Sequence, residues 1–326
     1  MTTSTAARVT EPPARPPRPH RRRSLTGGRR GLALYAYTLL LPAGAILLVF
    51  TGYPLVKMLL FSVQDYTRAN LFNRDKPVEL VGLENYREVL TDPTFWAVMA
   101  RSLALCAVLV TLTMTLGMLI ALLMNRLRTG LRVLVSIGLL LAWAMPQLTS
   151  TVVWGWMFDS EYGVVNHLLM QLGLEQYFQH SWLYSPLSFF LVLTLIITWQ
   201  SVPFVAFTLY GALTQVPGEV LEAAEIDGAN AQRRFWQVTI PFIKPVLAVV
   251  LILQVIWDMR VFTQVYALQG MGAQTEATNT IGVYIFRHGV AQGNFGTGSA
   301  IAVLLTVVML ILSFGYLRSM LKEAKP

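Results

Sequence analysis

The sequence predicts an all-α integral membrane protein with six transmembrane helices, and three observations lead to that prediction. Of its 326 residues, 55% are hydrophobic and only 13% are charged, whereas a soluble domain is roughly 25% charged. Apolar runs long enough to cross a bilayer, which takes about 20 residues as a helix, recur along the whole chain. These runs are continuous and do not alternate apolar with polar residues, so they indicate helices and exclude a closed β-barrel.

The apolar runs define six spans, which follow a polar N-terminal region. The expected spans are approximately Leu32–Val63, Val98–Met124, Leu131–Phe158, Leu187–Leu213, Val246–Leu268 and Ser299–Leu321. Residues 1–30 contain five prolines and eight arginines, and such a segment buries too little apolar surface to fold, so we expect a disordered basic tail. The next apolar run is longer than the roughly 7 to 15 residues of a signal-peptide core. We therefore expect residues 31–326 to form one transmembrane domain.

Basic residues predict the orientation, because Lys and Arg near span ends stay on the cytoplasmic side. Seventeen of the 25 Lys and Arg residues lie in the N-terminal tail, near residues 125–132, in the 214–245 loop and after residue 317. The alternate loops carry fewer basic residues. Both termini and the 214–245 loop are therefore expected to be cytoplasmic. The net charge of +8 follows from this topology and does not indicate nucleic-acid binding.

The loop at residues 214–245, between the fourth and fifth spans, carries the most specific pattern in the sequence. Residues 219–226 predict a short helix, because Glu219 and Glu222 suit the positive N-terminal end of a helix dipole. One face of this helix would be formed by Val220, Ala223 and Ala224. Gly228 then permits a sharp turn. A helix of this length is unstable alone in water, so it must pack either on the protein's own helices or on a partner.

This loop resembles the signature of the permease family of ATP-binding-cassette importers, which is Glu-Ala-Ala followed at fixed spacing by Gly and later by an aliphatic residue and Pro. The matching residues are Glu222, Ala223, Ala224, Gly228, Ile240 and Pro241, with Asp227 and Ala229 beside the glycine as in sugar-type members. Residues 82–96 and 154–174 also resemble segments of sugar permeases. The resemblance thus extends over most of residues 32–320.

The resemblance implies that residues 219–231 form coupling helices that dock into a groove on a separate ATPase. The expected contact residues are Glu219, Glu222, Ala223, Ala224, Asp227, Gly228 and Ala229. The implied partners are a second permease subunit in a pseudo-twofold heterodimer, two ATP-binding subunits and an extracytoplasmic sugar-binding lipoprotein, assembled in a bacterial inner membrane. The sequence contains no phosphate-binding Gly-x-x-x-x-Gly-Lys-Ser/Thr loop. We therefore expect no cofactor in this chain, with ATP and Mg²⁺ bound by the partner ATPase.

Polar groups within the spans are candidates for the solute path, because a central charge costs about 2.5 to 3.5 kcal/mol on insertion scales. The candidates are Trp143, Gln147, Thr149, Trp199, Gln200, Trp257, Asp258, Arg260 and Gln264. Asp258 and Arg260 are two residues apart, so on a continuous helix they would point about 200° apart. We expect at least one of them to face a polar cavity. The alternative is that both lie near the outer end of the span and reach the membrane interface.

The predicted function is therefore that of a non-catalytic permease subunit of an ATP-driven sugar importer, with maltose or trehalose as the expected kind of sugar. An importer of a peptide, a polyol or glycerol phosphate would share the same coupling loop. A more distant alternative is a membrane-embedded enzyme that uses Asp159 and Glu161 as acid and base, although no further catalytic cluster surrounds them. The four histidines are scattered and predict no metal site, and Cys106 is expected to be a packing residue.

Overall fold

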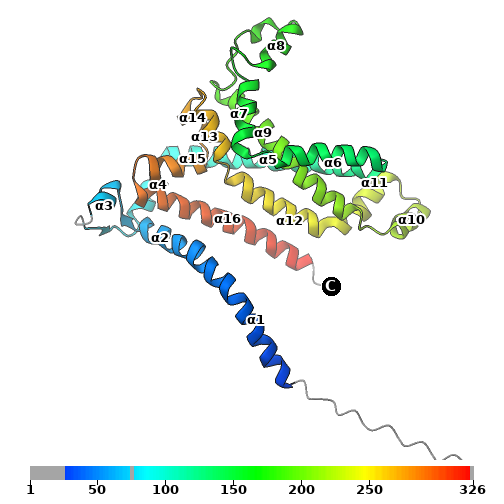
Figure 1. Cartoon of the computed structure of the whole chain (residues 1–326), viewed down its shortest axis with the longest axis horizontal. Coiled ribbons are helices and arrows are strands. Elements are labelled where there is room, and N and C mark those ends of the chain that lie inside the picture. The colour runs from blue at the N-terminus through cyan, green and yellow to red at the C-terminus, as the bar shows by residue number, and fades with distance from the viewer. Residues whose placement is uncertain (1–25, 74–76, 324–326) are drawn as a thin grey trace, which may run out of the picture. The chain divides into compact units, whose positions relative to one another are not determined.

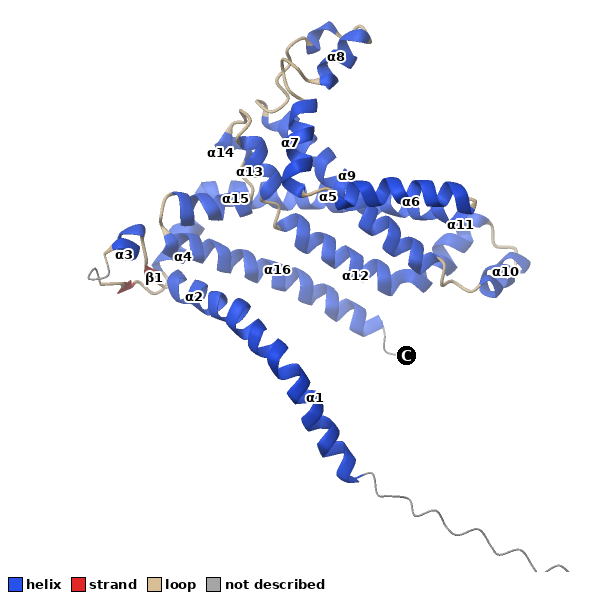
Figure 2. Ribbon diagram, in the orientation of Figure 1, coloured by secondary structure: helices blue, strands red, loops and turns tan. Residues whose placement is uncertain are grey.

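A computed structural model describes residues 26–73 and 77–323 and is helical almost throughout (Figures 1 and 2). Of the predicted basic tail, residues 1–30, the first 25 residues lie outside the described part of the chain. The chain divides into two units, the first ending at Val56 and the second beginning at Lys57. In the first unit lie α1 (Thr26–Leu47), a π-helical turn η1 (Leu48–Gly52) and the start of α2 (Tyr53–Ser62).

The second unit consists of long helices connected by short ones. The long helices are α5 (Pro93–Arg126), α6 (Thr129–Ala144), α7 (Gln147–Met157), α9 (Pro186–Leu213), α12 (Ile240–Met259) and α16 (Phe295–Glu323). The short helices are α3 (Arg68–Phe72), α4 (Glu84–Thr91), α8 (Val164–Gln171), α10 (Gly218–Ile226), α11 (Ala231–Arg234), α13 (Thr263–Gln269), α14 (Thr275–Thr278) and α15 (Ile281–Phe286). The remaining elements are the 3₁₀ turn η2 (Glu175–Tyr177), the π-helical turns η3 (Phe235–Thr239) and η4 (Arg287–Ala291), and the antiparallel strands β1 (Gln64–Asp65) and β2 (Glu79–Leu80).

The predicted all-α membrane fold is confirmed, with a change in the third span. Within the described residues, five helical stretches are long and apolar enough to cross a bilayer, and the pair α6 and α7 supplies a sixth if it counts as one span. The continuous span expected at Leu131–Phe158 is wrong, because α6 and α7 meet at 99°. Pro146 has no backbone N–H, and the preceding residue, Met145, takes an extended conformation, so the helix stops there.

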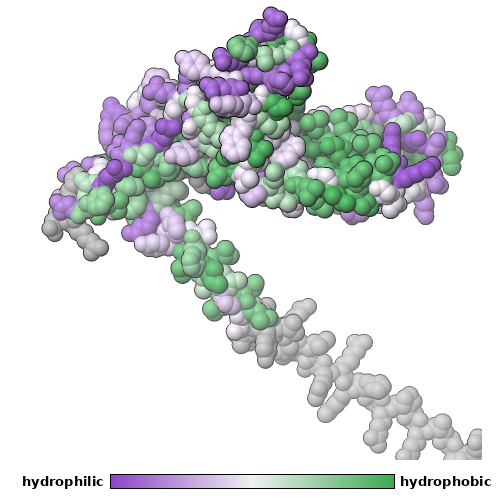
Figure 3. All heavy atoms as spheres, turned by 45° about the horizontal axis from the view of Figure 1, so that its top comes forward, coloured by the Kyte–Doolittle hydropathy of each residue, from purple (hydrophilic) through white to green (hydrophobic). Residues whose placement is uncertain are grey.

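The centre of the second unit is formed by α5 and α9, which pack along each other, with α12 against both and α6 against α9. Helix α9 is apolar on all sides, which is typical of a buried helix, and its wholly buried residues include Phe189, Leu193, Ile196, Val205 and Leu209. Apolar side chains gather over the α6 and α12 region, whereas hydrophilic ones gather around α10 and α11 (Figure 3). This distribution fits a bundle whose middle lies in lipid.

The N-terminus of α5 is held by a hydrogen-bonded carboxylate. The Asp92 carboxylate accepts hydrogen bonds from the Thr94 backbone N–H at 2.8 Å and from the Tyr284 hydroxyl of α15 at 2.9 Å. Burial raises the pKa of Asp92, but these hydrogen bonds outweigh it and hold the pKa below its usual value. Nearby, the Arg101 guanidinium donates to the Asn279 carbonyl oxygen at 2.9 Å. These contacts fix the segment that follows α13 against α5.

The crossing of η4 and α16 is made by two glycines. A methyl group added to Gly298 would overlap the Cα of Gly289 and lie 2.8 Å from its backbone nitrogen. Gly138, in α6, has no atom within 4 Å of the corresponding position in the described part of the chain.

We predict that Gly298→Ala lowers the free energy of unfolding by about 1 to 3 kcal/mol, as overpacking typically does. Gly138→Ala is the matched control and should be neutral or stabilising by up to about 1 kcal/mol, because alanine favours a helix. Thermal unfolding of the purified protein in detergent measures both. Equal stability of the two variants would contradict the close crossing.

Candidate functional site

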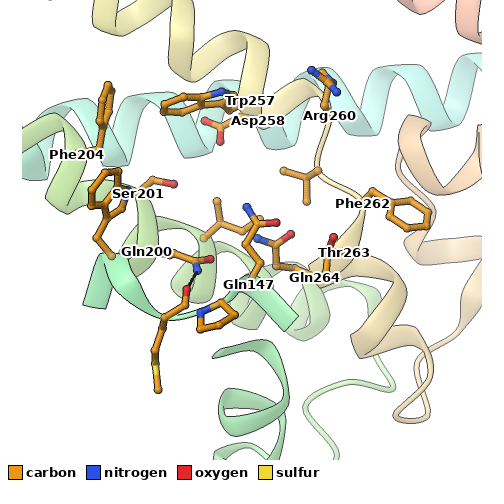
Figure 4. A pocket seen from close by; sticks show the side chains of 15 residues that line it. Gln147, Gln200, Ser201, Phe204, Trp257, Asp258, Arg260, Phe262, Thr263 and Gln264 are labelled. Carbon is orange, nitrogen blue, oxygen red and sulfur yellow. Dashed lines mark hydrogen bonds between the residues drawn. The ribbon is translucent and has the colours of Figure 1, made fainter. Parts of the chain in front are cut away.

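A cavity of about 580 Å³ lies between α9 and two breaks in the membrane helices. One break separates α6 from α7 at residues 145–146, and the other separates α12 from α13 at residues 260–262. Residues from both breaks line the cavity (Figure 4). A helix end leaves backbone N–H and C=O groups without partners inside the helix. At membrane depth such backbone is tolerated only where it is covered by protein or lines a cavity.

Gln200 of α9 satisfies one of the groups that the first break leaves free. Its side-chain amide N–H donates a hydrogen bond to the carbonyl oxygen of Met145 at 2.9 Å, drawn as a dashed line in Figure 4. Only 9% of Gln200 is exposed. The central helix is thus tied to the bend between α6 and α7, and the bend becomes a fixed part of the cavity wall.

Asp258 brings a buried carboxylate to the cavity from the last turn of α12. Its side chain points into the space between α12 and α9 (Figure 4), although only 5% of the residue is exposed. Its Oδ2 atom has no hydrogen-bond partner in the described part of the chain. An unsatisfied buried group costs about 1 to 3 kcal/mol, and more if charged. The arrangement therefore leaves a buried acceptor without a partner in the wall of the cavity.

Gln254 lies one helical turn before Asp258, so it shares the same face of α12. Gln254 is fully buried, and neither atom of its side-chain amide has a partner among the residues described. The sequence analysis missed this residue. The signal that could have found it is a lone glutamine within the apolar run from Val246 to Trp257.

Arg260 lines the same cavity as Asp258, and the two side chains point in different directions (Figure 4). The expectation of about 200° between them assumed a continuous helix. Instead α12 ends at Met259, and Arg260 has left helical geometry, with φ −104° and ψ 16°. Arg260 is exposed, whereas Asp258 is buried. Aromatic side chains form part of the cavity wall, where Phe204 meets the edge of Trp257 at a ring-centre distance of 5.0 Å.

Seven of the nine predicted solute-path residues line this one cavity: Trp143, Gln147, Gln200, Trp257, Asp258, Arg260 and Gln264. Thr149 does not, because it lies two residues after Gln147 and therefore projects from a different side of α7. Trp199 does not either, and packs instead against Trp154 at a ring-centre distance of 5.8 Å. The cavity also includes Ser201, Phe204, Phe262 and Thr263, which the sequence analysis did not single out.

The predicted coupling residues lie on and just after α10, at the end of the second unit that also holds α11 (Figure 1). Helix α10 begins at Gly218, one residue before the predicted start, and none of its residues is buried. Gly228 has a φ of +82°, as the predicted sharp turn requires. The exposed members of the set are Glu219, Glu222, Ala223, Asp227 and Gly228, and the half-buried members are Ala224 and Ala229. Helix α12 runs from this end of the unit to the cavity.

The acid–base pair of the enzyme alternative is engaged in a turn. The Asp159 carboxylate accepts hydrogen bonds from the backbone N–H groups of Glu161, at 2.8 Å, and Tyr162, at 3.0 Å. Its observed role is to stabilise the chain after α7. Among residues 26–73 and 77–323, no three His, Cys, Asp or Glu side chains are grouped so that they could hold a metal ion.

Comparison with known proteins identifies the family. Residues 88–322 match the model of the family described as "binding-protein-dependent transport system inner membrane component", and the chain belongs to this family. It is 44% identical to the diacetylchitobiose uptake system permease protein DasB of Streptomyces coelicolor, over 91% of this chain and 92% of that protein. It is 35% identical to the trehalose/maltose transport system permease protein MalF of Thermococcus litoralis, over 88% of this chain and 93% of that one.

The fold is also that of a solved transporter subunit. A chain in the crystal structure of a bacterial alginate ABC transporter, in complex with an alginate pentasaccharide-bound periplasmic protein, matches with a TM-score of 0.75 and 21% identity. The match covers 93% of this chain and 99% of that one. The chain is therefore a non-catalytic transport permease, and the enzyme alternative with Asp159 and Glu161 is wrong.

We predict that Gln200→Leu lowers the free energy of unfolding by about 1 to 3 kcal/mol, because it leaves the Met145 carbonyl without its donor. Ser201→Ala is the matched control, since Ser201 lines the same cavity and its hydroxyl makes no described hydrogen bond. Thermal unfolding in detergent distinguishes them. If the two variants unfold at the same temperature, the hydrogen bond does not hold the bend.

Proposed function

We propose that this chain is one of two permease subunits of an ATP-driven sugar importer and that it forms half of the translocation path. The observation that carries the proposal is its identity of 44% and 35%, over about nine-tenths of the chain, to permeases of a diacetylchitobiose system and a trehalose/maltose system. The cavity supports it as well. Aromatic faces suit the CH faces of a sugar, and a few placed polar groups suit its hydroxyls.

The proposed assembly contains a second permease subunit, two ATP-binding subunits and an extracytoplasmic sugar-binding lipoprotein, in a bacterial inner membrane. Family membership supports a binding protein as partner. The distribution of Lys and Arg supports cytoplasmic termini and a cytoplasmic α10. ATP and Mg²⁺ would be bound by the ATP-binding subunits.

In the proposed mechanism, α10 is the contact with the ATPase. Its residues are all at least partly exposed, and they include Val220 at 44% and Ile226 at 87%. The ATPase would cover these exposed side chains in the proposed complex. Closure of the ATPase would then move α10, and the bundle would alternate between inward-open and outward-open states. Such a shift requires different contacts in the two states, which the proposed docking surface supplies.

We further propose that the sugar binds in the cavity between the two helix breaks. Asp258, Gln147 and Gln264 offer hydrogen-bonding groups, and Trp143 and Trp257 offer aromatic faces. A half-helix end that faces a cavity at the bilayer midplane is a recurring way to place polar groups in a transporter.

Uptake measured in the native host tests the substrate class. Deletion of this gene should abolish accumulation of labelled N,N′-diacetylchitobiose, trehalose or maltose, and its return should restore accumulation. Uptake of a dipeptide, a polyol and glycerol phosphate should be unchanged. If only one of these last three depended on the gene, the sugar assignment would fail while the transport role stood.

We predict that Gly228→Asp and Ala224→Trp each abolish uptake while the protein still inserts, because bulk at these positions blocks close approach of the ATPase. Gly82→Asp is the matched control. Gly82 also has a positive φ, +61°, and at both glycines an added Cβ would meet no atom within 4 Å in the described part of the chain. Backbone strain is therefore similar in the two aspartate variants. Co-purification of the ATPase, together with uptake, is the measurement, and normal uptake by Gly228→Asp would rule out docking at this turn.

A further inference from the structure

The coupling helix α10 has few attachments to its own chain. None of its residues is buried, and it packs on α11 and η3. Its side chain Leu221 lies beside a small hollow of about 290 Å³, which Leu213 and Phe235 also line. A helix of nine residues is marginal without external contacts. The direction of α10 must therefore be fixed by the few groups that contact it.

One such group is an ion pair between α10 and α11. The Arg234 guanidinium contacts the carboxylate of Glu225, and the two residues come from different helices. The Arg234 side chain is 25% exposed and that of Glu225 is 66% exposed. The neighbouring Arg233 points elsewhere, since its Nε–H donates to the Gln237 side chain at 2.9 Å. The two adjacent arginines thus make different contacts, and of the two only Arg234 contacts α10.

The backbone between α10 and α11 turns sharply. Gly228 has a φ of +82°, and Asn230 caps α11 by accepting a hydrogen bond from the Arg233 backbone N–H at 2.8 Å. A turn that depends on glycine gives one covalent hinge between the two helices. The ion pair joins α10 and α11 at a second point. Two points of attachment fix the angle between the two helices, whereas the turn alone does not.

Arg234 also lies where the chain begins to run from α11 toward the cavity. It is the last residue of α11, and it is followed by η3 and then by α12, which ends beside Asp258. Residues 231–269 qualify together as one membrane-crossing helical stretch. A group that ties α10 to Arg234 therefore ties it to the helix that carries the cavity carboxylate.

We propose that Glu225 and Arg234 form a positioning pair, which holds α10 at a fixed angle to α11 so that movement of the ATPase passes into α12. This inference rests on the coupling role proposed above and adds the contact that transmits the motion. A partly exposed pair changes an equilibrium by roughly two- to fivefold. That is enough to alter the efficiency of coupling without being needed for folding.

The test uses the complete transporter, with both permease subunits, the ATPase and the binding protein, in proteoliposomes. The measured quantity is the amount of sugar transported per ATP hydrolysed. Glu225→Arg and Arg234→Glu should each lower this ratio at least two- to fivefold, and the double variant, which restores opposite charges, should return it to within about twofold of wild type. Arg233→Glu is the matched control, with the same change of charge and the pair intact, and should resemble wild type.

Two results would overturn the proposal. Single variants that couple as well as wild type would show that the pair positions nothing. A double variant as poor as the single ones would show that the two residues do not act through their contact with each other. If a reversed charge prevents assembly, Glu225→Gln decides, because an unchanged ratio in that variant also overturns the proposal. Failure of the coupling role itself is distinguishable, since Gly228→Asp would then show normal uptake and normal co-purification of the ATPase.

Discussion

The structure depends on the requirement that backbone polar groups at membrane depth find partners or face a cavity. Two of the membrane-crossing stretches are not continuous helices, because one is interrupted at Pro146 and the other after Met259. The breaks are tolerated because they meet at one place, where α9 supplies Gln200 to the freed Met145 carbonyl. The same breaks turn polar side chains toward a shared space. The features that disrupt the helices are thus those that create the candidate site.

Helix α12 links the two regions of the molecule that we propose to be functional. At one end it continues from α11 and η3, next to the exposed α10, and at the other it brings Asp258 to the cavity. A stiff helix transmits displacement along its axis, whereas a chain of loops would absorb it. This connection gives a physical reason why a short motif at residues 222–241 would accompany the proposed solute path in the same chain.

The fold was largely predictable from the sequence, because the bilayer restricts long apolar segments to helices. Seven of the nine path candidates meet in one cavity for the related reason that polar groups within spans need a polar neighbour. The bend at Pro146 was missed, since a proline within a membrane helix need not end it, as Pro203 inside α9 shows. The position of Arg260 just outside the helix was missed because it depends on where α12 ends, which tertiary packing decides. Gln254 escaped notice because its burial is set by helices distant in sequence.

The most direct measurement of the central claim is sugar protection of a single thiol in the cavity. Cys106 is the only cysteine of the chain, so Cys106→Ser removes every thiol from this subunit. Gln147→Cys then places a thiol on the cavity wall, and Thr149→Cys places one two residues away, outside the cavity. In the assembled transporter, the transported sugar should slow labelling of the first thiol by a membrane-impermeant reagent and leave the second unaffected. Labelling of both at rates independent of sugar would contradict a solute path between the two helix breaks.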